Sequence, residues 1–246
     1  MKKKNVDLNI VDVKKDTSPV IPQRDKIRNP LKIYQRVFTD NQKKLLDLLL
    51  DKNSKIVFVS GPAGTSKTYL AIYTALTLLN QRRVSDLIYI RSAVESADSK
   101  LGFLPGEADD KMAPYLQPLL DKLSELLSKS DVDSLQKDDR ISAVPVGFLR
   151  GLNWNTKIII ADEAQNMTYK ELFTLITRTG EFSKVIILGD PEQSDINGKS
   201  GFIKMMSHFD DDESKINGIQ VFRFTDDDIV RSGLVRFIIK KSRKTA

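Results

Sequence analysis

The segment Gly61–Thr68, which reads Gly-Pro-Ala-Gly-Thr-Ser-Lys-Thr, constrains the fold of this chain more than any other part of its sequence. It follows the apolar run Lys55–Ser60 and precedes the helix-like run Tyr69–Asn80. A glycine-rich turn that leaves a strand and leads through Lys-Thr into a helix is the context of a phosphate-binding loop. Its backbone amides can surround a phosphate, and the helix N-terminus adds partial positive charge. The pattern therefore predicts a nucleotide-binding site.

Within this loop, Lys67 is expected to reach the β- and γ-phosphates, and Thr68 to offer a hydroxyl ligand to Mg²⁺. The second glycine of the usual pattern is replaced by Ser66. Its Cβ would narrow the loop if the residue needs a positive φ, whereas its hydroxyl would add a polar group near the phosphates. The alternative, a Gly/Ser turn that binds nothing, disagrees with the partner motifs described below. The residues of this segment that are expected to contact the nucleotide are Gly61, Pro62, Ala63, Gly64, Thr65, Ser66, Lys67, Thr68 and Tyr69.

Composition excludes several other classes of protein. With 246 residues, 40% of them hydrophobic, the chain is long enough for one large domain with a proper core. No stretch approaches the ~20 apolar residues of a membrane span, and the start lacks the apolar segment of a secretory signal. The absence of cysteine excludes disulfides and thiolate metal sites, and the single histidine, His208, excludes a histidine-rich zinc site. These features predict a soluble, cytoplasmic protein without membrane contacts.

The formal net charge of +6 is carried by the two ends of the chain. Residues 1–30 hold eight Lys and Arg and four Asp, and residues 240–246 hold four Lys and Arg, so that the body, residues 31–239, is slightly acidic. We interpret residues 1–30 as a flexible basic arm with one short strand at Val6–Val13, and residues 240–246 as a basic, solvated tail. Charge confined to two tails indicates nucleic-acid binding only weakly.

Helical and strand-like patterns alternate through the body of the chain. A helix is expected over Asn41–Leu50, with Thr39 or Asp40 as its N-cap. Near-continuous apolar strands separated by helices indicate a parallel sheet that is covered on both faces, which is an α/β three-layer fold. The expected strands are Lys55–Ser60, Asp86–Arg91, Val144–Phe148, Lys157–Ala161, Lys184–Leu188 and Ile219–Phe224.

Residues 92–144 interrupt this alternation in the manner of an insertion, with an amphipathic helix near Tyr115–Ser128 followed by a strongly polar stretch. Further helices are expected over Tyr69–Asn80 and Tyr169–Arg178. A last helix is expected to start after Thr225 as its N-cap. Its apolar face would carry Ile229, Val230, Leu234 and Ile238.

Two of the expected strands end in acidic or amide side chains. The strand that ends at Ala161 is followed by Asp162 and Glu163, and another ends in Gly189-Asp190, shortly before Gln193. Because the carboxyl ends of parallel strands share one edge of a sheet, Asp162 is expected to hold Mg²⁺ and Glu163 to polarise the attacking water. Gln193 is expected to bond the γ-phosphate or that water. Taken alone, each pattern also fits an acidic helix start or an ordinary Gly-Asp-Pro turn.

Together these ordered motifs resemble those of the PhoH family of ATPases, a family named for induction by phosphate starvation and similar to the first RecA-like domain of superfamily-one helicases. The resemblance runs from about Asn41 to Ile239. It departs from the family pattern at Ser66, which stands in place of the usual glycine, and in the basic arm 1–30. The matching segments are Gly61–Thr68, Arg91–Glu95, Leu101–Gly106, Pro114–Pro118, Phe148–Gly151, Asp162–Asn166, Thr177–Arg178, Gly189–Gln193, Ser200–Gly201 and Asp228–Arg231.

The resemblance implies further roles. Gln42 is similar to the glutamine that reads adenine edges and so favours ATP over GTP, although it fits a solvated helix start equally well. Arg91 and Arg178 resemble family arginines near a nucleic-acid face or a subunit border, and each fits a structural ion pair equally well. An arginine on the γ-phosphate accelerates phosphoryl transfer. Helicases that resemble this chain supply that arginine from a second RecA-like domain, and we expect no room for a second such domain in this chain. The resemblance therefore implies an arginine from a neighbouring copy, Arg231 first and Arg150 second, and a ring-shaped homo-oligomer.

The expected function is Mg²⁺-dependent hydrolysis of ATP, coupled to single-stranded RNA or DNA in a helicase-like or translocase-like manner. Phe103 is the aromatic candidate for contact with a base. Two alternatives stay open: a nucleotide-switched binding module with little hydrolysis, for which Ser66 leaves room, and a small-molecule or nucleotide kinase, which needs an acceptor pocket and a mobile arginine lid. Glu163 and Gln193 favour hydrolysis over both.

Overall fold

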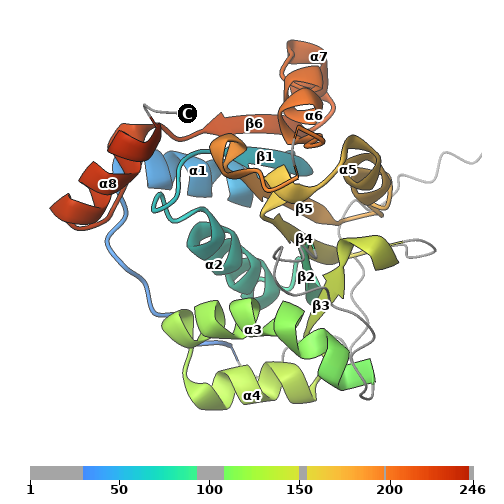
Figure 1. Cartoon of the computed structure of the whole chain (residues 1–246). Coiled ribbons are helices and arrows are strands. Elements are labelled where there is room, and N and C mark those ends of the chain that lie inside the picture. Colours follow the sequence, from blue (N-terminus) through green and yellow to red (C-terminus); the bar gives the residue numbers. More distant parts are fainter. Residues whose placement is uncertain (1–29, 93–107, 150–153, 197, 244–246) are drawn as a thin grey trace, which may run out of the picture.

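A six-stranded parallel sheet forms the centre of the protein (Figure 1). The computed structural model describes residues 30–92, 108–149, 154–196 and 198–243. The strand order is β3-β2-β4-β5-β1-β6, and every neighbouring pair is parallel. The predicted three-layer α/β fold with a parallel central sheet is confirmed. The strands are β1 (Ile56–Ser60), β2 (Asp86–Arg91), β3 (Ile141–Pro145), β4 (Lys157–Asp162), β5 (Lys184–Gly189) and β6 (Ile219–Arg223).

Helices cover both faces of the sheet, and each face has its own apolar core. Alternate residues of β1 point to opposite faces, so Val57 and Val59 belong to one core and Phe58 to the other. The first face is covered by α1 (Asp40–Leu50), α2 (Lys67–Asn80), α3 (Ala108–Leu126) and α4 (Lys129–Lys137). The second is covered by α5 (Tyr169–Ile176) and α6 (Phe202–His208). The smaller elements are α7 (Asp212–Ile216), α8 (Gly233–Arg243) and the 3-10 helices η2 (Val146–Phe148), η3 (Ala164–Asn166), η4 (Pro191–Gln193) and η5 (Asp226–Asp228).

Helix α1 begins where its sequence predicts. The Thr39 hydroxyl accepts the Gln42 backbone N–H at 3.3 Å, and the Gln42 side chain accepts the Thr39 N–H at 3.1 Å. This reciprocal capping box satisfies two of the N–H groups that a helix start leaves without partners. The cap also brings the Gln42 side chain to the end of the helix that faces the Gly61–Thr68 loop.

The structure corrects the predicted strand Val144–Phe148. Strand β3 starts three residues earlier, at Ile141, which pairs with Leu87 of β2. It ends at Pro145, which has no N–H for a ladder, and Val146–Phe148 forms the turn η2. The segment 92–144 therefore includes most of an edge strand of the main sheet. The polar stretch before it forms α4, which is capped by Ser128 and buries Val132 and Leu135.

The C-terminal helix also differs from the prediction. Thr225 caps only the single turn η5, through a bond from its N–H to Asp228 Oδ2 at 2.7 Å. The chain then extends, and the Val230 N–H donates to the Gly64 carbonyl at 2.9 Å, so that α8 begins only at Gly233. Ile229 is consequently buried, whereas Leu234 and Ile238 are exposed and do not share a face with it. The expected solvated tail is helical as far as Arg243.

Some predicted features lie outside the described residues: the arm up to residue 29 with its short strand Val6–Val13, the loop that contains Phe103, and Arg150. Within the described parts of the chain, no helix has both the length and the apolar character needed to cross a membrane.

Candidate nucleotide-binding site

Strands β1, β5 and β4 are parallel neighbours, with β5 between the other two, so their carboxyl ends lie side by side at one edge of the sheet. The predicted site segments follow these three strands directly, and the Gly61 N–H donates to the Gly189 carbonyl at 3.2 Å. A cavity of about 590 Å³ opens between them, which is a size typical of nucleotide and cofactor sites. The expected site residues that line it are Gln42, Ala63, Gly64, Ser66, Lys67, Thr68, Tyr69, Asp162, Glu163, Gln193 and Arg231.

The loop wraps around the Lys67 side chain. The Lys67 Nζ donates to the Gly61 carbonyl at 2.6 Å and to the Pro62 carbonyl at 2.9 Å. The Thr65 hydroxyl donates to the same Pro62 carbonyl at 3.0 Å. Burial lowers the pKa of Lys67, although the carboxylates of Asp190 and Asp162 oppose this shift. A cation held at the mouth of a loop of backbone amides is suited to bind phosphate groups.

Ser66 adopts the backbone conformation that the usual glycine would adopt, with φ 70° and ψ 25°. A residue with a Cβ pays a steric cost in this left-handed region, and the Ser66 hydroxyl forms no cap bond to α2. We expect Ser66→Gly to raise the free energy of unfolding by roughly 0.5–1 kcal/mol, since relief of strain exceeds the added freedom of the unfolded chain. Equilibrium denaturation in urea checks this value.

Ser66→Ala is the matched control for that substitution. Alanine keeps the Cβ and removes only the hydroxyl, so its free energy of unfolding should stay close to that of the native protein. An equal gain in both variants would show that the hydroxyl, rather than the backbone strain, is the unfavourable feature.

The predicted metal-binding pair meets in the structure. The Thr68 hydroxyl donates to Asp162 Oδ2 at 3.0 Å, and the Tyr89 hydroxyl donates to the same oxygen at 2.7 Å. Burial, with the adjacent Asp162 carboxylate, raises the pKa of Tyr89, which keeps its hydroxyl a donor. Sequence analysis missed Tyr89, because in β2 it is one residue of an apolar run. A hydroxyl and a carboxylate are the oxygen ligands that suit Mg²⁺, which usually takes one or two protein ligands beside phosphate and water.

Glu163 has a strained backbone, with φ 54° in the left-handed region. Its Oε2 accepts the Gln165 Nε2 at 2.6 Å, and its Oε1 lies 3.9 Å from the Arg91 guanidinium. Gln165 is almost fully buried, and it also accepts the Asp190 N–H at 3.0 Å and donates to the Gln193 carbonyl at 3.4 Å. This amide therefore ties the turn after β4 to the turn after β5, a link that no spacing in the sequence indicates.

Gln42 lines the cavity and is only 3% exposed. Its Nε2 donates to the Thr65 carbonyl at 3.3 Å, while its oxygen is engaged by the cap of α1. The alternative that Gln42 is a solvated residue at a helix start is therefore wrong. Its side chain is buried and hydrogen-bonds the phosphate loop. Its reading of adenine stays a prediction.

The cavity is also lined by residues that sequence analysis did not find. The Arg36 guanidinium lies 4.8 Å from the centre of the Tyr69 ring and 2.8 Å from Glu125 of α3. Lys122 of α3 lines the cavity as well. Part of the expected insertion therefore contributes to the site, although many residues separate it from the loop.

The arginines lie in three different places. Arg231 lies against its own chain's loop, where a Cβ on Gly64 would come within 2.8 Å of the Arg231 Cγ. Arg91 lies beside Glu163, as described above. Arg178 follows α5, where its carbonyl accepts the N–H of Trp154 ahead of β4, at the opposite edge of the sheet from the cavity. Arg231 thus lies beside the loop of its own chain, and its contribution to the site of a neighbouring copy stays a prediction.

Comparisons with known proteins find sequence relatives over most of the chain. The family model described as PhoH-like protein matches residues 35–242. The chain is 38% identical to a PhoH-like protein of Mycobacterium tuberculosis over 203 residues, which cover 82% of this chain and 56% of that protein. It is 37% identical to a PhoH-like protein of Bacillus subtilis over 207 residues, covering 83% of this chain and 63% of the relative. Protein PhoH of Escherichia coli is 31% identical over 202 residues, covering 80% and 56%.

The chain therefore spans about 56–63% of the length of these curated relatives. Among solved structures, the Pif1 helicase from Candida albicans superposes with a TM-score of 0.39 at 15% identity, covering 78% of this chain and 40% of that chain.

Proposed function

The chain belongs to the PhoH family, and from this membership and the geometry of the cavity we propose that it binds ATP with Mg²⁺ and hydrolyses it. One observation supports this proposal above the others. The Thr68 hydroxyl and the Asp162 carboxylate are 3.0 Å apart at the mouth of the phosphate loop, with Glu163 as the next residue. A metal ligand pair beside a carboxylate base is what hydrolysis of a nucleoside triphosphate needs.

Each residue has a separate task in the proposed reaction. Lys67 and the loop amides bind the phosphates, and Thr68 and Asp162 would hold Mg²⁺, with Tyr89 orienting the carboxylate. When bound, the metal neutralises charge on the β- and γ-phosphate oxygens. Glu163, oriented by Gln165, accepts a proton from the attacking water. Gln193 faces the cavity from the turn after β5 and would bond the γ-phosphate or the water.

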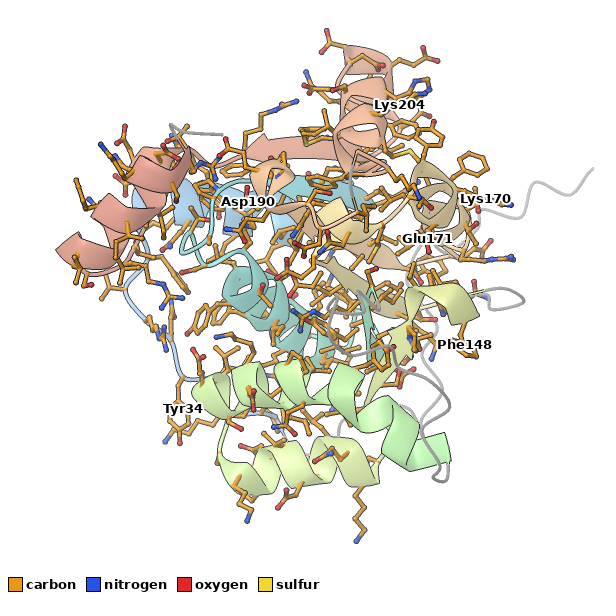
Figure 2. All side chains as sticks on the ribbon, viewed as in Figure 1. Tyr34, Phe148, Lys170, Glu171, Asp190 and Lys204 are labelled. Atoms are coloured by element: carbon orange, nitrogen blue, oxygen red, sulfur yellow. The ribbon has the colours of Figure 1, made fainter. Side chains whose placement is uncertain are left out.

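Coupling to single-stranded RNA or DNA is the second part of the proposal. Arg91 lies at the carboxyl end of β2, and its guanidinium is 3.9 Å from Glu163. A nucleic-acid phosphate that attracted Arg91 would free this carboxylate to act as the base. Phe148 follows β3 at the same edge of the sheet and is 74% exposed (Figure 2). A base could stack on its ring, a contact of the same kind as the one predicted for Phe103.

Steady-state hydrolysis of ATP, with and without single-stranded RNA or DNA, tests both parts. We expect hydrolysis that stops when EDTA removes Mg²⁺ and that nucleic acid stimulates. Phe148→Ala should keep the basal rate and lose the stimulation, because Phe148 does not line the cavity. Hydrolysis that is indifferent to nucleic acid would contradict the coupling alone. Tight ATP binding without hydrolysis would favour the nucleotide-switched binding module.

A homo-oligomer remains a prediction, which the family resemblance implies through an arginine donated by a neighbouring copy. In the single chain, Arg231 lies against its own phosphate loop. Light scattering across a range of protein concentrations measures self-association directly. A monomer with the same hydrolysis rate per chain at every concentration would contradict any contribution from a second copy.

A further inference from the structure

Arg243, in the last turn of α8, forms ion pairs with three carboxylates. Its guanidinium lies 3.2 Å from Asp190, 2.8 Å from Glu192 and 3.2 Å from Asp226. The arginine side chain is mostly buried among these partners, at 19% exposure. A residue from the expected solvated tail is thus held at the turn that follows β5.

Asp190 connects Arg243 to the phosphate loop. Its carboxylate is 5% exposed, and Oδ2 accepts the Ala63 backbone N–H at 3.1 Å. Both oxygens of the same carboxylate accept from the Arg243 guanidinium, at 3.2 and 3.3 Å. A single carboxylate therefore separates a loop amide from an arginine. Arg243 is also close enough to contribute to the lowered pKa of Lys67.

The position of α8 depends on its polar contacts. None of its residues is buried, and Leu234 and Phe237 are exposed. Besides Arg243, Lys240 pairs with Asp227 at 2.8 Å and Arg236 donates to the Ile229 carbonyl at 2.5 Å. In Figure 1 the helix lies at the periphery, beside the loop between β1 and α2. Its basic last turn contacts the cavity-lining Asp190 through Arg243.

A phosphate group can accept the same donors as the Asp190 carboxylate. It takes backbone N–H groups at a loop and binds a guanidinium through two parallel bonds. Ala63 belongs to the side of the loop that faces the turn of Asp190 and Gln193, where the γ-phosphate is expected. A γ-phosphate and the Asp190 carboxylate would therefore compete for the Ala63 N–H and for Arg243.

We propose that Arg243 is a catalytic arginine that the chain supplies to its own γ-phosphate, exchanging the Asp190 carboxylate for phosphate oxygens when ATP binds. This inference rests on the proposed function. Glu192 and Asp226 hold the guanidinium during the exchange, so the arginine is already in place. Its charge then stabilises the negative charge that develops on the γ-phosphate oxygens as water attacks.

The test compares Arg243→Ala, Arg243→Lys and Lys240→Ala in the full chain. For Arg243→Ala we expect kcat for ATP to fall about 1,000-fold or more, the lower end of the range that such arginines contribute. Arg243→Lys keeps a positive charge that can hold α8 in place. It lacks the planar guanidinium that binds two phosphate oxygens at once, so kcat should fall about 10-fold or more. Lys240→Ala removes another contact of α8, to Asp227, and should change kcat less than about threefold.

Binding measurements distinguish two roles of Arg243: direct contact with the γ-phosphate, and structural support of α8 alone. Arg243→Ala should weaken binding of a non-hydrolysable ATP analogue and leave ADP binding unchanged, because ADP has no γ-phosphate. Equal weakening of both nucleotides, or a kcat within about threefold of the native value, would overturn the inference. If Arg243→Ala fails to fold, Arg243→Lys supplies the same comparison. A native chain that binds ATP but does not hydrolyse it contradicts the proposed function, whereas the comparison of the ATP analogue with ADP still tests Arg243.

Discussion

Exchanging Glu163 for glutamine is expected to lower the rate of ATP hydrolysis by roughly 100- to 10,000-fold, the range that a positioned general base contributes. Glutamine has nearly the same shape and still offers an oxygen to Gln165, so the turn after β4 should keep its geometry. What it cannot do is accept a proton from the attacking water. Binding of ATP should change little, because Glu163 is not among the proposed phosphate ligands, which are Lys67 and the loop amides.

Steady-state kinetics and a separate binding measurement check this prediction. Glu181→Gln is the matched control, since Glu181 is an exposed glutamate ahead of β5, at the other edge of the sheet. It should leave both hydrolysis and binding unchanged. If Glu163→Gln retained more than about a tenth of the native rate, another group would have to activate the water. If it lost ATP binding as well, Glu163 would be needed to form the site itself.

Replacing Gly201 with alanine is expected to lower the free energy of unfolding by about 3 kcal/mol, at the upper end of the cost of overpacking. A Cβ at this position would come within 2.1 Å of the Tyr169 nitrogen and 2.3 Å of the Tyr169 Cα. These are backbone atoms at the start of α5, so they cannot move aside as the end of a side chain can. The Gly201 N–H donates to the Met167 carbonyl at 2.9 Å, which holds the two segments together.

Equilibrium denaturation measures this loss, and Gly147→Ala is its control. A Cβ at Gly147 meets no atom within 4 Å, so that variant should stay within about 0.5 kcal/mol of the native protein. A loss of less than about 1 kcal/mol for Gly201→Ala would mean that the start of α6 can shift away from α5 at little cost.

Local sequence patterns predicted the sheet and the segments that meet at the cavity. The strand limits of β2 at Asp86 and Arg91 were predicted correctly, because a buried strand in a parallel sheet is a continuous apolar run between polar ends. The convergence of the loop with Asp162 and Glu163 also follows from local order, since parallel strands present their carboxyl ends on one edge. Edge strand β3 was misplaced, because it is half-exposed and lacks the continuous apolar signal.

The contacts that complete the site were decided only by the tertiary structure. Tyr89 reaches Asp162 from a neighbouring strand, and Arg36 reaches Glu125 across the cavity, because packing brings together segments that are distant in the chain. Arg243 is the clearest case: in sequence it is one basic residue near the end of the chain, and in the fold its guanidinium binds the carboxylate that accepts a phosphate-loop amide. The sequence by itself determined the parallel sheet, the loop and its acidic partners, since each depends on residues close in the chain. The tertiary structure decided which charged residues from distant parts of the chain lie beside the loop and its acidic partners. An ion pair depends on distance in space and leaves no periodicity in the sequence.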